Sequence, residues 1–407
     1  MTVLAFPGIH RRVPVALGAC LFSFAGFWIA QRAADVSMID LMVYRAEGET
    51  VRAGGDLYAL RATEAELPTT YPPFAALLFT PLTLPDPAAL RTLATAGNLA
   101  LLVGFVGLSL RIAGHARVET VWWVAAVAVW CEPVWTTLRY GQVNLLLAVL
   151  VLWDLSRPPG HRWAGVGIGL AAAVKLTPGL FAVFLLATGL AAWARRRAGG
   201  PWLRHARGAA VTFAAATLLA AAVLPYDSWR FWTRMVFAAG RVGHPEDTAN
   251  QALRGALARL LHTPEPGAWW IALAAVTGAL GLAVAVAAEL RGRRGRGVTA
   301  CAVTALLICP VSWSHHWVWC VPVVLVTARR RAVAVGMALV FCSYALWWVP
   351  HGPGRLELGQ NGVELTLSAL YATAGLLFLA LSAIETLKPS RNVDPTIKPN
   401  DQAVTNE

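Results

Sequence analysis

Long apolar segments follow one another along almost the whole chain, and they restrict its possible folds more than any other feature. Hydrophobic residues make up 57% of the 407 residues and charged residues only 14%, and the mean hydropathy is +0.56. A helix needs about 20 apolar residues to cross a bilayer, so shorter runs are interpreted as spans interrupted by Pro or polar residues. The sequence predicts an all-α polytopic membrane protein, with spans near 13–31, 90–111, 119–137, 143–155, 162–175, 178–194, 208–224, 267–289, 297–311, 316–327, 331–349 and 364–386.

Basic residues determine the predicted orientation of these spans. Arginine clusters lie at 195–197, 291–297 and 329–331, and such clusters are typical of the cytoplasmic ends of transmembrane helices. Segment 71–88, which contains YPPFAALLFTPLTLP, would move all three clusters outside if it crossed the membrane. It is therefore predicted to be re-entrant or interfacial, in a chain with about twelve transmembrane helices and both termini in the cytoplasm. The net charge of +12 is assigned to topology and to membrane lipids, so no nucleic-acid partner is expected.

The expected organisation is one transmembrane domain over 1–387 followed by a short tail. Two sizeable loops then lie on the external side, 32–70 and 225–266. The tail, 388–407, is polar and contains Pro, which predicts a disordered cytoplasmic segment. No small-residue cleavage site follows the first apolar run, so this run is interpreted as an uncleaved span.

The first external loop is rich in acids, although the rest of the chain has few. It holds seven of the 22 acidic residues. Segment 37–52 is predicted to be a juxtamembrane helix that ends at Gly54 and Gly55. Its apolar residues, among them Met38, Leu41 and Val43, would lay it on the membrane surface.

One face of that helix carries candidate functional residues. Asp40, Tyr44 and Glu47 follow one another at helical spacing. A carboxylate at the water–lipid boundary is where a general base would lie if the substrates were lipid-linked. Asp40 is the first candidate and Glu47 the reserve. The alternative is that Ser37 and Asp40 form a capping box at the helix start.

Lys175 is a second candidate because lysine is rare in this sequence. The chain has three lysines against 31 arginines, and Lys175 lies between two apolar runs in AGVGIGLAAAVKLTPGLF. An unpaired cation in such surroundings is costly, so a membrane-embedded lysine suggests function. The alternative is a side chain that reaches the outer interface beside Pro178.

Segment 310–320, PVSWSHHWVWC, places His315 and His316 among tryptophans at an outer helix end. Adjacent histidines point about 100° apart on a helix, so the two do not easily address one metal ion. Hydrogen bonding to a phosphate or sugar is the preferred interpretation, and interfacial packing is the alternative. Further polar residues fall on the same predicted side of the membrane, namely Gln142, Asn144, Asn250, Gln251 and Arg254.

Several of these segments, taken in order, resemble glycosyltransferase family 87 of actinobacteria. They are DLMVYRAEGETVRAGGDLY, YPPFAALLFTPLTLP, GQVNLLLAVLVLWDL, AGVGIGLAAAVKLTPGLF, NQALRG and SWSHHWVW, within about 13–350. The resemblance implies a GT-C membrane glycosyltransferase that takes a sugar from a polyprenyl phosphate at the outer face of the cytoplasmic membrane. Well-known members make α-(1→2) mannosyl linkages on phosphatidylinositol mannosides, and another adds arabinofuranose to cell-wall arabinan.

The resemblance also implies roles for residues. It matches the family's catalytic Asp to Asp40 in IDLMVYR, and it matches Lys175, His315 and His316 to later motifs. The expected donor-phosphate ligands are Lys175, His315, His316 and Arg254. The expected substrate contacts are Tyr44, Glu47, Tyr71, Gln142, Asn144, Asn250, Gln251, Trp313 and Trp317. No Asp-x-Asp motif occurs, so neither a metal nor a cofactor is expected.

The expected function is inverting, metal-independent mannosyl transfer from polyprenyl phosphomannose to a glycolipid acceptor. Within the enzyme interpretation, an arabinofuranosyl donor is the alternative. Outside it, the alternatives are a flippase or transporter of lipid-linked sugars and a scaffold protein of the cell envelope. The first would favour acids inside spans and a repeated architecture, and neither is evident here. The second would not need Asp40, Lys175 and the two histidines to share a cavity.

Overall fold

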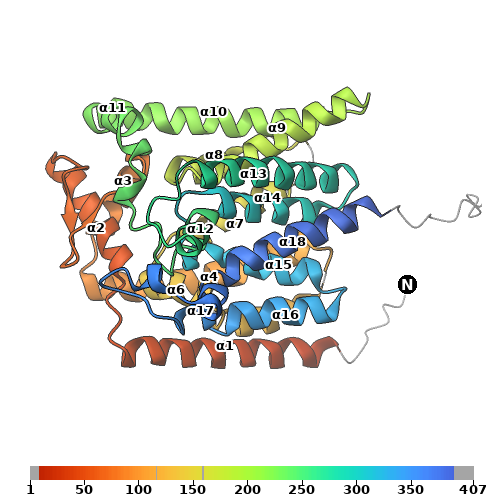
Figure 1. Cartoon of the computed structure of the whole chain (residues 1–407), viewed down its shortest axis with the longest axis horizontal. Helices are drawn as coiled ribbons and strands as arrows, with labels where there is room; N and C mark the ends of the chain where they lie inside the picture. The colour runs from red at the N-terminus through yellow and green to blue at the C-terminus, as the bar shows by residue number, and fades with distance from the viewer. Residues whose placement is uncertain (1–8, 116, 158–159, 389–407) are drawn as a thin grey trace, which may run out of the picture.

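The structure is a computed structural model that describes residues 9–115, 117–157 and 160–388, and almost all of its regular structure is helical (Figure 1). Its α-helices are α1 (Ile9–Ala33), α2 (Ile39–Ala53), α3 (Pro73–Phe79), α4 (Pro87–Ile112), α5 (Val118–Ala128), α6 (Glu132–Tyr140), α7 (Asn144–Leu155), α8 (Val166–Val174), α9 (Gly179–Ala194), α10 (Gly200–Val223), α11 (Pro225–Thr233), α12 (Leu253–Leu260), α13 (Gly267–Leu290), α14 (Arg294–Ile308), α15 (Cys320–Thr327), α16 (Arg331–Cys342), α17 (Gly362–Ser368) and α18 (Leu370–Leu387). The 3₁₀ turns are η1 (Thr80–Thr83), η2 (Met235–Phe237), η3 (Ala239–Arg241), η4 (Ser314–Trp319), η5 (Ala345–Trp347) and η6 (Leu356–Gly359). Strands β1 (Arg61–Ala62) and β2 (Leu67–Pro68) pair antiparallel.

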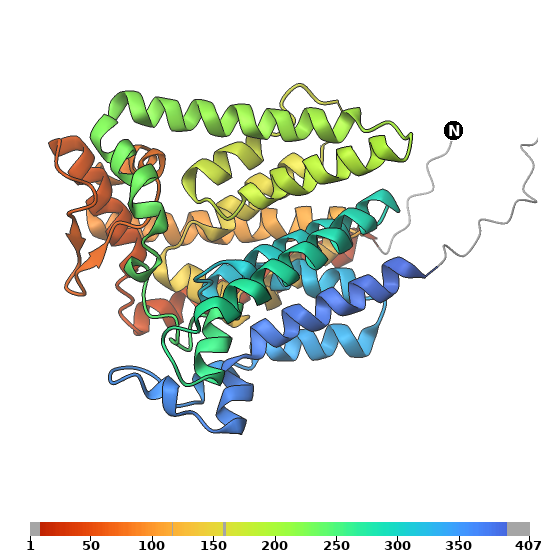
Figure 2. The same cartoon turned by 45° about the horizontal axis from the view of Figure 1, so that its top comes forward.

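The long helices lie side by side, and the two ends of this bundle differ (Figures 1 and 2). Helices α2, α6, α11 and α17 gather at one end, on the left of Figure 1. Helix α1 begins and α18 ends at the other end, where the α9–α10, α13–α14 and α15–α16 connections also turn. Those connections carry the arginine clusters of 195–197, 291–297 and 329–331. The basic clusters therefore lie opposite α2.

The helical membrane architecture predicted from the sequence is confirmed in outline. Five helices of the described chain are long and apolar enough to cross a bilayer: α1, α4, α10, α13 and α18. Helices α5 and α6 make a sixth if their pair, bent by 74°, counts as one span. Other apolar runs are broken into short helices, for example between α8 and α9, where Pro178 begins a new helix. The number twelve thus stays a prediction, as does the re-entrant character of 71–88.

Helix α2 begins two residues later than predicted and ends where predicted. Gly54, with φ of 67°, stops the helix in the left-handed conformation that glycine adopts readily. The residue before the helix is Met38, and no side chain caps the helix start. The proposed capping box of Ser37 and Asp40 is therefore wrong, because the backbone at Met38 is left-handed and Ser37 lies outside the helix.

Helix α2 packs inside the protein, against α3 and η1. Gly48 permits this close approach, since a Cβ there would lie 2.5 Å from the carbonyl oxygen of Phe79. Met38, Leu41 and Val43 are buried, so the expectation that they lie on the membrane surface is wrong. Leu41 lies against Gly141 at the end of α6, and Val43 lines a cavity. The predicted disordered tail lies outside the described residues, apart from Lys388.

Candidate active site

The junction between α6 and α7 positions the first candidate residue, Asp40. Helix α6 ends at Gly141, whose φ is 69°, and a Cβ at this position would lie 2.7 Å from the Cβ of Leu41 on α2. A glycine is needed here both for the left-handed backbone and for the close contact. The next residue, Gln142, then reaches across to α2.

The Asp40 carboxylate receives a hydrogen bond from that side chain. Gln142 Nε2 donates to Asp40 Oδ2 over 2.8 Å, and Gln142 Oε1 accepts from Tyr44 over 2.7 Å and from Tyr71 over 3.2 Å. The two tyrosine hydroxyls are 2.8 Å apart. Because the hydroxyls hold the amide oxygen, the amide NH₂ group must face Asp40. Burial raises the pKa of Asp40, against the opposing effects of the Gln142 hydrogen bond and the positive charge of Lys175, so the carboxylate is a stronger base than usual.

Lys175 lies where α8 gives way to extended backbone, with φ of −149° and ψ of 127°. Its Nζ lies 2.8 Å from His316 Nε2 and 3.3 Å from Asn144 Oδ1. It also lies 5.6 Å from the centre of the Tyr71 ring, within the range of a cation–π interaction. Tyr71 therefore contacts both the group that holds Asp40 and the candidate phosphate ligand.

The hydrogen bonds of His316 fix where its ring carries the proton. The backbone N–H of Trp313 donates to His316 Nδ1 over 3.1 Å, so the proton of a neutral ring lies on Nε2. Lys175 Nζ lies within hydrogen-bond distance of Nε2 and donates to Asn144 Oδ1. The negative charge of an arriving phosphate would favour the ammonium form of Lys175.

His315 presents a free ring nitrogen. Its backbone oxygen accepts hydrogen bonds from Thr137 over 2.7 Å and Asn144 over 3.0 Å. Its buried Nε2 has no partner among the described residues. The ring lies edge-on to Tyr140, with centroids 5.5 Å apart, and at 88° to the ring of His316. The rings of the two neighbouring histidines therefore contact each other nearly at right angles, with centroids 4.7 Å apart.

Glu132 holds the histidine segment in place and was not among the predicted site residues. Its side chain is fully buried at the start of α6. It accepts four hydrogen bonds, from Thr136 over 2.9 Å, Ser314 over 2.8 Å, Trp347 over 3.1 Å and Tyr371 over 2.9 Å. A buried carboxylate needs such a complete set of donors. Through them Glu132 joins α6, η4, η5 and α18.

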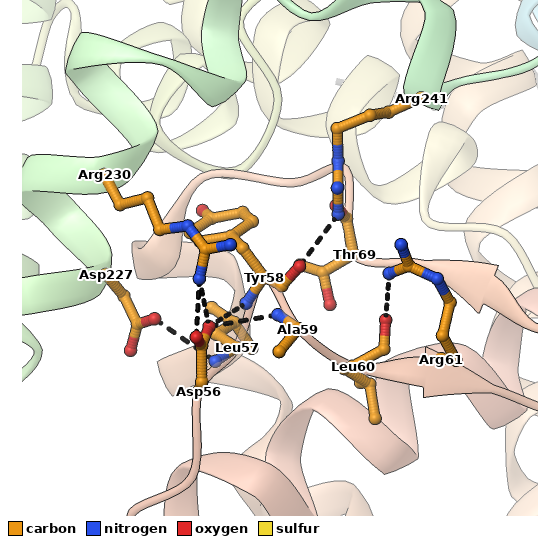
Figure 3. A network of polar contacts seen from close by, with 10 residues as sticks. All are labelled: Asp56, Leu57, Tyr58, Ala59, Leu60, Arg61, Thr69, Asp227, Arg230 and Arg241. Atoms are coloured by element: carbon orange, nitrogen blue, oxygen red, sulfur yellow. Dashed lines mark hydrogen bonds and ion pairs between the residues drawn. The ribbon is translucent and has the colours of Figure 1, made fainter.

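The two predicted external loops contact one another beside the site (Figure 3). Arg230 forms an ion pair with Asp56, and Asp227 accepts a hydrogen bond from the backbone of Leu57 over 3.2 Å. Arg241 donates to the carbonyl oxygens of Tyr58 over 3.1 Å and Thr69 over 3.4 Å. The segments 54–69 and 225–241 therefore form one wall.

A single cavity of about 690 Å³ opens between this wall and the histidine segment. It brings together most of the predicted site residues: Asp40, Tyr44, Tyr71, Gln142, Lys175, Trp313, His315 and His316 all line it. Asn144 lies directly behind, bonded to Lys175. The volume is typical of a site for a small molecule.

The remaining predicted residues do not line this cavity. Asn250 and Gln251 are fully buried and bond to backbone atoms of neighbouring segments, including the Ser312 N–H at 3.0 Å and the Ser368 oxygen at 2.6 Å. Trp317 packs against Phe341 and Tyr371 in the core. Arg254 lies 5.6 Å from the ring of Trp270.

Glu47, the reserve carboxylate, is buried about two turns beyond Asp40 along α2 and does not line the cavity. Neither carboxylate oxygen has a hydrogen-bond partner among the described residues. Burial raises the pKa of Glu47 to about 8, although the nearby Thr69 hydroxyl lowers it slightly. The side chain is therefore mostly neutral at pH 7.

The chain matches the profile of Glycosyltransferase family 87 over residues 70–310. That segment covers α3 to α14 and includes Tyr71, Gln142 and Lys175. The chain belongs to glycosyltransferase family 87. It is accordingly a glycosyltransferase, and the resemblance stated from its motifs is confirmed.

Several relatives match most of the length of this family 87 chain. The polyprenol-phosphate-mannose-dependent alpha-(1-2)-phosphatidylinositol mannoside mannosyltransferase of Mycobacterium tuberculosis is 33% identical, over 77% of this chain and 76% of its own. The Mycolicibacterium smegmatis protein of the same name is 36% identical, over 74% of each chain. The corresponding pentamannoside mannosyltransferase of M. smegmatis is 33% identical, over 81% of this chain and 75% of its own.

Among solved structures, the crystal structure of ArnT from Cupriavidus metallidurans bound to undecaprenyl phosphate is similar to the family 87 chain. The TM-score is 0.41 and the sequence identity 16%, over 94% of this chain and 78% of that one. Across the described parts of the family 87 chain, no three His, Cys, Asp or Glu side chains are arranged to hold a metal ion.

Sequence reasoning missed several residues of the family 87 site. Tyr140, Arg241 and His244 line the cavity, and Glu132 organises the segment behind it. One feature of the sequence could have identified Glu132. It is an acidic residue among apolar runs that contain almost no other acidic residues. Arg241 and His244 are basic residues in a loop predicted to be external, which also sets them apart from the arginine clusters predicted to be cytoplasmic.

Proposed function

We propose that this family 87 enzyme transfers mannose from polyprenyl phosphomannose to a phosphatidylinositol mannoside-like glycolipid, with inversion, to form an α-(1→2) linkage. One observation carries the proposal: Asp40 and the Lys175–His316 pair line the same cavity. A base and a cationic phosphate site are the two groups that such a transfer requires. The names of the mannosyltransferase relatives give polyprenol phosphate mannose as their donor, which supports the choice of sugar. They give a phosphatidylinositol mannoside as the acceptor, which supports the choice of acceptor.

In the proposed reaction, Asp40 removes the proton from the acceptor hydroxyl as its oxygen attacks the anomeric carbon of the donor mannose. The bond between that carbon and the phosphate oxygen breaks, and the polyprenyl phosphate leaves. Attack from the opposite face converts a β-linked donor into an α-linked product. Lys175 and the histidines receive the developing phosphate charge. Trp313 and the cavity tyrosines offer flat faces for sugars.

A second, more apolar cavity supports a lipid-linked donor. Lys175, Asn144 and His316 line it together with apolar side chains of α7, α9 and α14, namely Leu147, Ala148, Val151, Phe181, Ala302, Ala305 and Leu306. Lys175 and His316 are thus shared between a polar cavity and an apolar one. The second cavity is small, about 50 Å³, so in this proposal a phosphate at Lys175 keeps its sugar in the first cavity and only the carbon atoms next to the phosphate in the second.

The site is proposed to face the external side of the cytoplasmic membrane. The arginine-bearing connections lie at the opposite end of the bundle from α2, and the positive-inside rule assigns that end to the cytoplasm. The start of α1 and the end of α18 lie at the same end of the bundle as the arginine clusters, which supports cytoplasmic termini. A GT-C architecture with twelve spans and a re-entrant 71–88 segment belongs to the same proposal.

The test uses the purified full-length enzyme in nanodiscs, with EDTA present. Labelled polyprenyl phosphomannose and a short phosphatidylinositol mannoside are supplied, and the linkage of the product is determined by NMR. An α-(1→2)-mannosylated lipid is the expected product. Transfer from polyprenyl phosphoarabinose alone would replace mannose by arabinofuranose as the donor sugar. Transfer that EDTA abolishes and Mg²⁺ restores would contradict metal independence. Movement of the donor across the bilayer without transfer would favour a flippase.

A further inference from the structure

Three cysteines meet where the bend between α5 and α6 packs against the α15–α16 hairpin. Cys131 directly precedes α6, Cys320 begins α15, and Cys342 ends α16. The sulfur atoms of Cys131 and Cys342 are 3.1 Å apart, although 211 residues separate them in sequence. A disulfide bond length is about 2.05 Å, so a movement of about 1 Å would close the bond.

Access distinguishes this pair from the other cysteines. Cys131 and Cys342 are both partly exposed, whereas Cys20, Cys301 and Cys320 are buried. Cys309 is partly exposed but its thiol bonds the backbone oxygen of Val311 in another part of the protein. Cys131 and Cys342 alone among the six combine mutual contact with access for a reagent.

The pair lies next to the framework of the active site. Cys131 is followed by Glu132, whose carboxylate accepts hydrogen bonds from the side chains of Ser314 and Trp347. Ser314 and Trp347 both line the cavity. A hydrogen bond also joins the α5–α6 bend to the segment after α16, because the Tyr344 hydroxyl donates to the Trp130 carbonyl oxygen over 3.2 Å. A covalent bond here would fix the two segments that hold the histidines.

We propose that Cys131 and Cys342 form a disulfide bond in the enzyme as it exists in the cell. This inference rests on the proposed orientation, in which this end of the bundle faces the oxidising side of the membrane. Each thiol loses its proton, and the pair gives two electrons to the disulfide of an extracytoplasmic thiol–disulfide oxidoreductase. That oxidant becomes a dithiol, and exchange proceeds through a mixed disulfide at one of these two partly exposed cysteines.

The bond closes a long loop, so it restricts the unfolded chain more than a short one would. It also holds the α5–α6 bend against the end of α16, where Trp347 follows. The oxidised enzyme is therefore expected to unfold at a higher temperature than the reduced enzyme. Cys320, buried beside Cys131, remains a thiol.

Thiol counting on membranes from cells that express the full chain tests the proposal. Free thiols are blocked under denaturing conditions without reductant, the protein is reduced, and newly released thiols are labelled with a maleimide that adds a resolvable mass. Wild type is expected to release two thiols. Cys131→Ser and Cys342→Ser should each release none, and the matched control Cys20→Ser should still release two. No release from wild type, or release that persists in Cys342→Ser, would overturn the pairing.

A reporter on the same side separates this proposal from the orientation on which it rests. Glu64 is exposed in the turn between β1 and β2, and Glu64→Cys in the Cys131→Ser/Cys342→Ser background can be labelled on intact cells with a membrane-impermeant maleimide. Labelling together with no thiol release from wild type would reject the disulfide and keep the orientation. Absence of labelling on intact cells, with labelling after lysis, would reject both.

Discussion

Lys175 contacts several other residues of the site. A conservative substitution is therefore needed to test its positive charge without removing its other contacts. Its Nζ contacts His316, Asn144 and the face of Tyr71. Glutamine at this position keeps hydrogen-bonding capacity but cannot carry a positive charge. The phosphate that leaves the donor would then lose its cationic partner in the transition state.

Lys175→Gln should therefore lower the rate of mannosyl transfer by about 10²–10³-fold, the usual cost of losing one group that stabilises developing negative charge. The measurement is kcat and KM for the polyprenyl phosphomannose donor. Lys388→Gln is the matched control, because Lys388 pairs with Glu385 at the far end of α18. Equal loss in both variants would show that the effect does not come from the site.

Glu47 gives a prediction about stability rather than catalysis. Its pKa is about 8 in the folded protein against 4.5 ordinarily, so between these values the folded state binds one more proton than the unfolded state. The stability from this group is present below pH 4.5 and is lost as pH rises through 8. The loss amounts to at most about 1.4 kcal/mol per pH unit.

Glu47→Gln removes this titration, so the variant should gain stability relative to wild type as the pH rises from 5 to 7.5. The check is the difference in thermal unfolding midpoint between wild type and variant at several pH values in one detergent. Glu49→Gln is the control, since Glu49 is exposed and paired with Arg45. A constant difference across this pH range would contradict a raised pKa for Glu47.

At the scale of elements, the breaks between helices position the chemistry. Gly141 ends α6 against α2, Lys175 follows α8, and His315 and His316 lie on the 3₁₀ turn η4. Irregular backbone is tolerated at membrane depth where it lines a cavity, because polar groups there can be satisfied. Several apolar runs of the sequence are short because helix breaks such as those at Gly141 and Lys175 interrupt them.

Gly141→Ala tests whether the α6–α7 break aligns Asp40. The left-handed backbone costs about 1–3 kcal/mol for a residue with a Cβ, and the Cβ would meet Leu41 on α2. We expect a lower unfolding temperature and weaker transfer, because α2 must move away from Gln142. Gly104→Ala in α4 is the control, since nothing lies within 4 Å of a Cβ there and alanine favours a helix. Unchanged activity in Gly141→Ala would show that the close contact does not matter.

Elements with local signals could be predicted from the sequence. The pair Gly54-Gly55 marked the end of α2. The Glu132 contacts could not be predicted, because Ser314, Trp347 and Tyr371 lie 182, 215 and 239 residues away. The burial of Met38 and Leu41 also depends on packing between segments, such as that of Leu41 against Gly141, which periodicity does not reveal.

At the scale of the whole molecule, the fold brings a carboxylate and a cation from distant segments into one cavity. Asp40 comes from α2, Lys175 from the middle of the chain, and the histidines from a segment after α14. The sequence indicated these residues as candidates for one site. It did not separate the residues that line the cavity from Asn250, Gln251 and Trp317, which support it.

The central claim is that Asp40 is the base, and one substitution tests it most directly. Asn retains the shape of Asp and can still accept the hydrogen bond from Gln142, so Asp40→Asn should fold normally. Transfer from polyprenyl phosphomannose should fall about 10²–10⁴-fold, the usual cost of removing a general base. Asp35→Asn, at an exposed position just before α2, is the matched control and should transfer at the wild-type rate. Wild-type transfer by Asp40→Asn, with its unfolding temperature unchanged, would contradict the account.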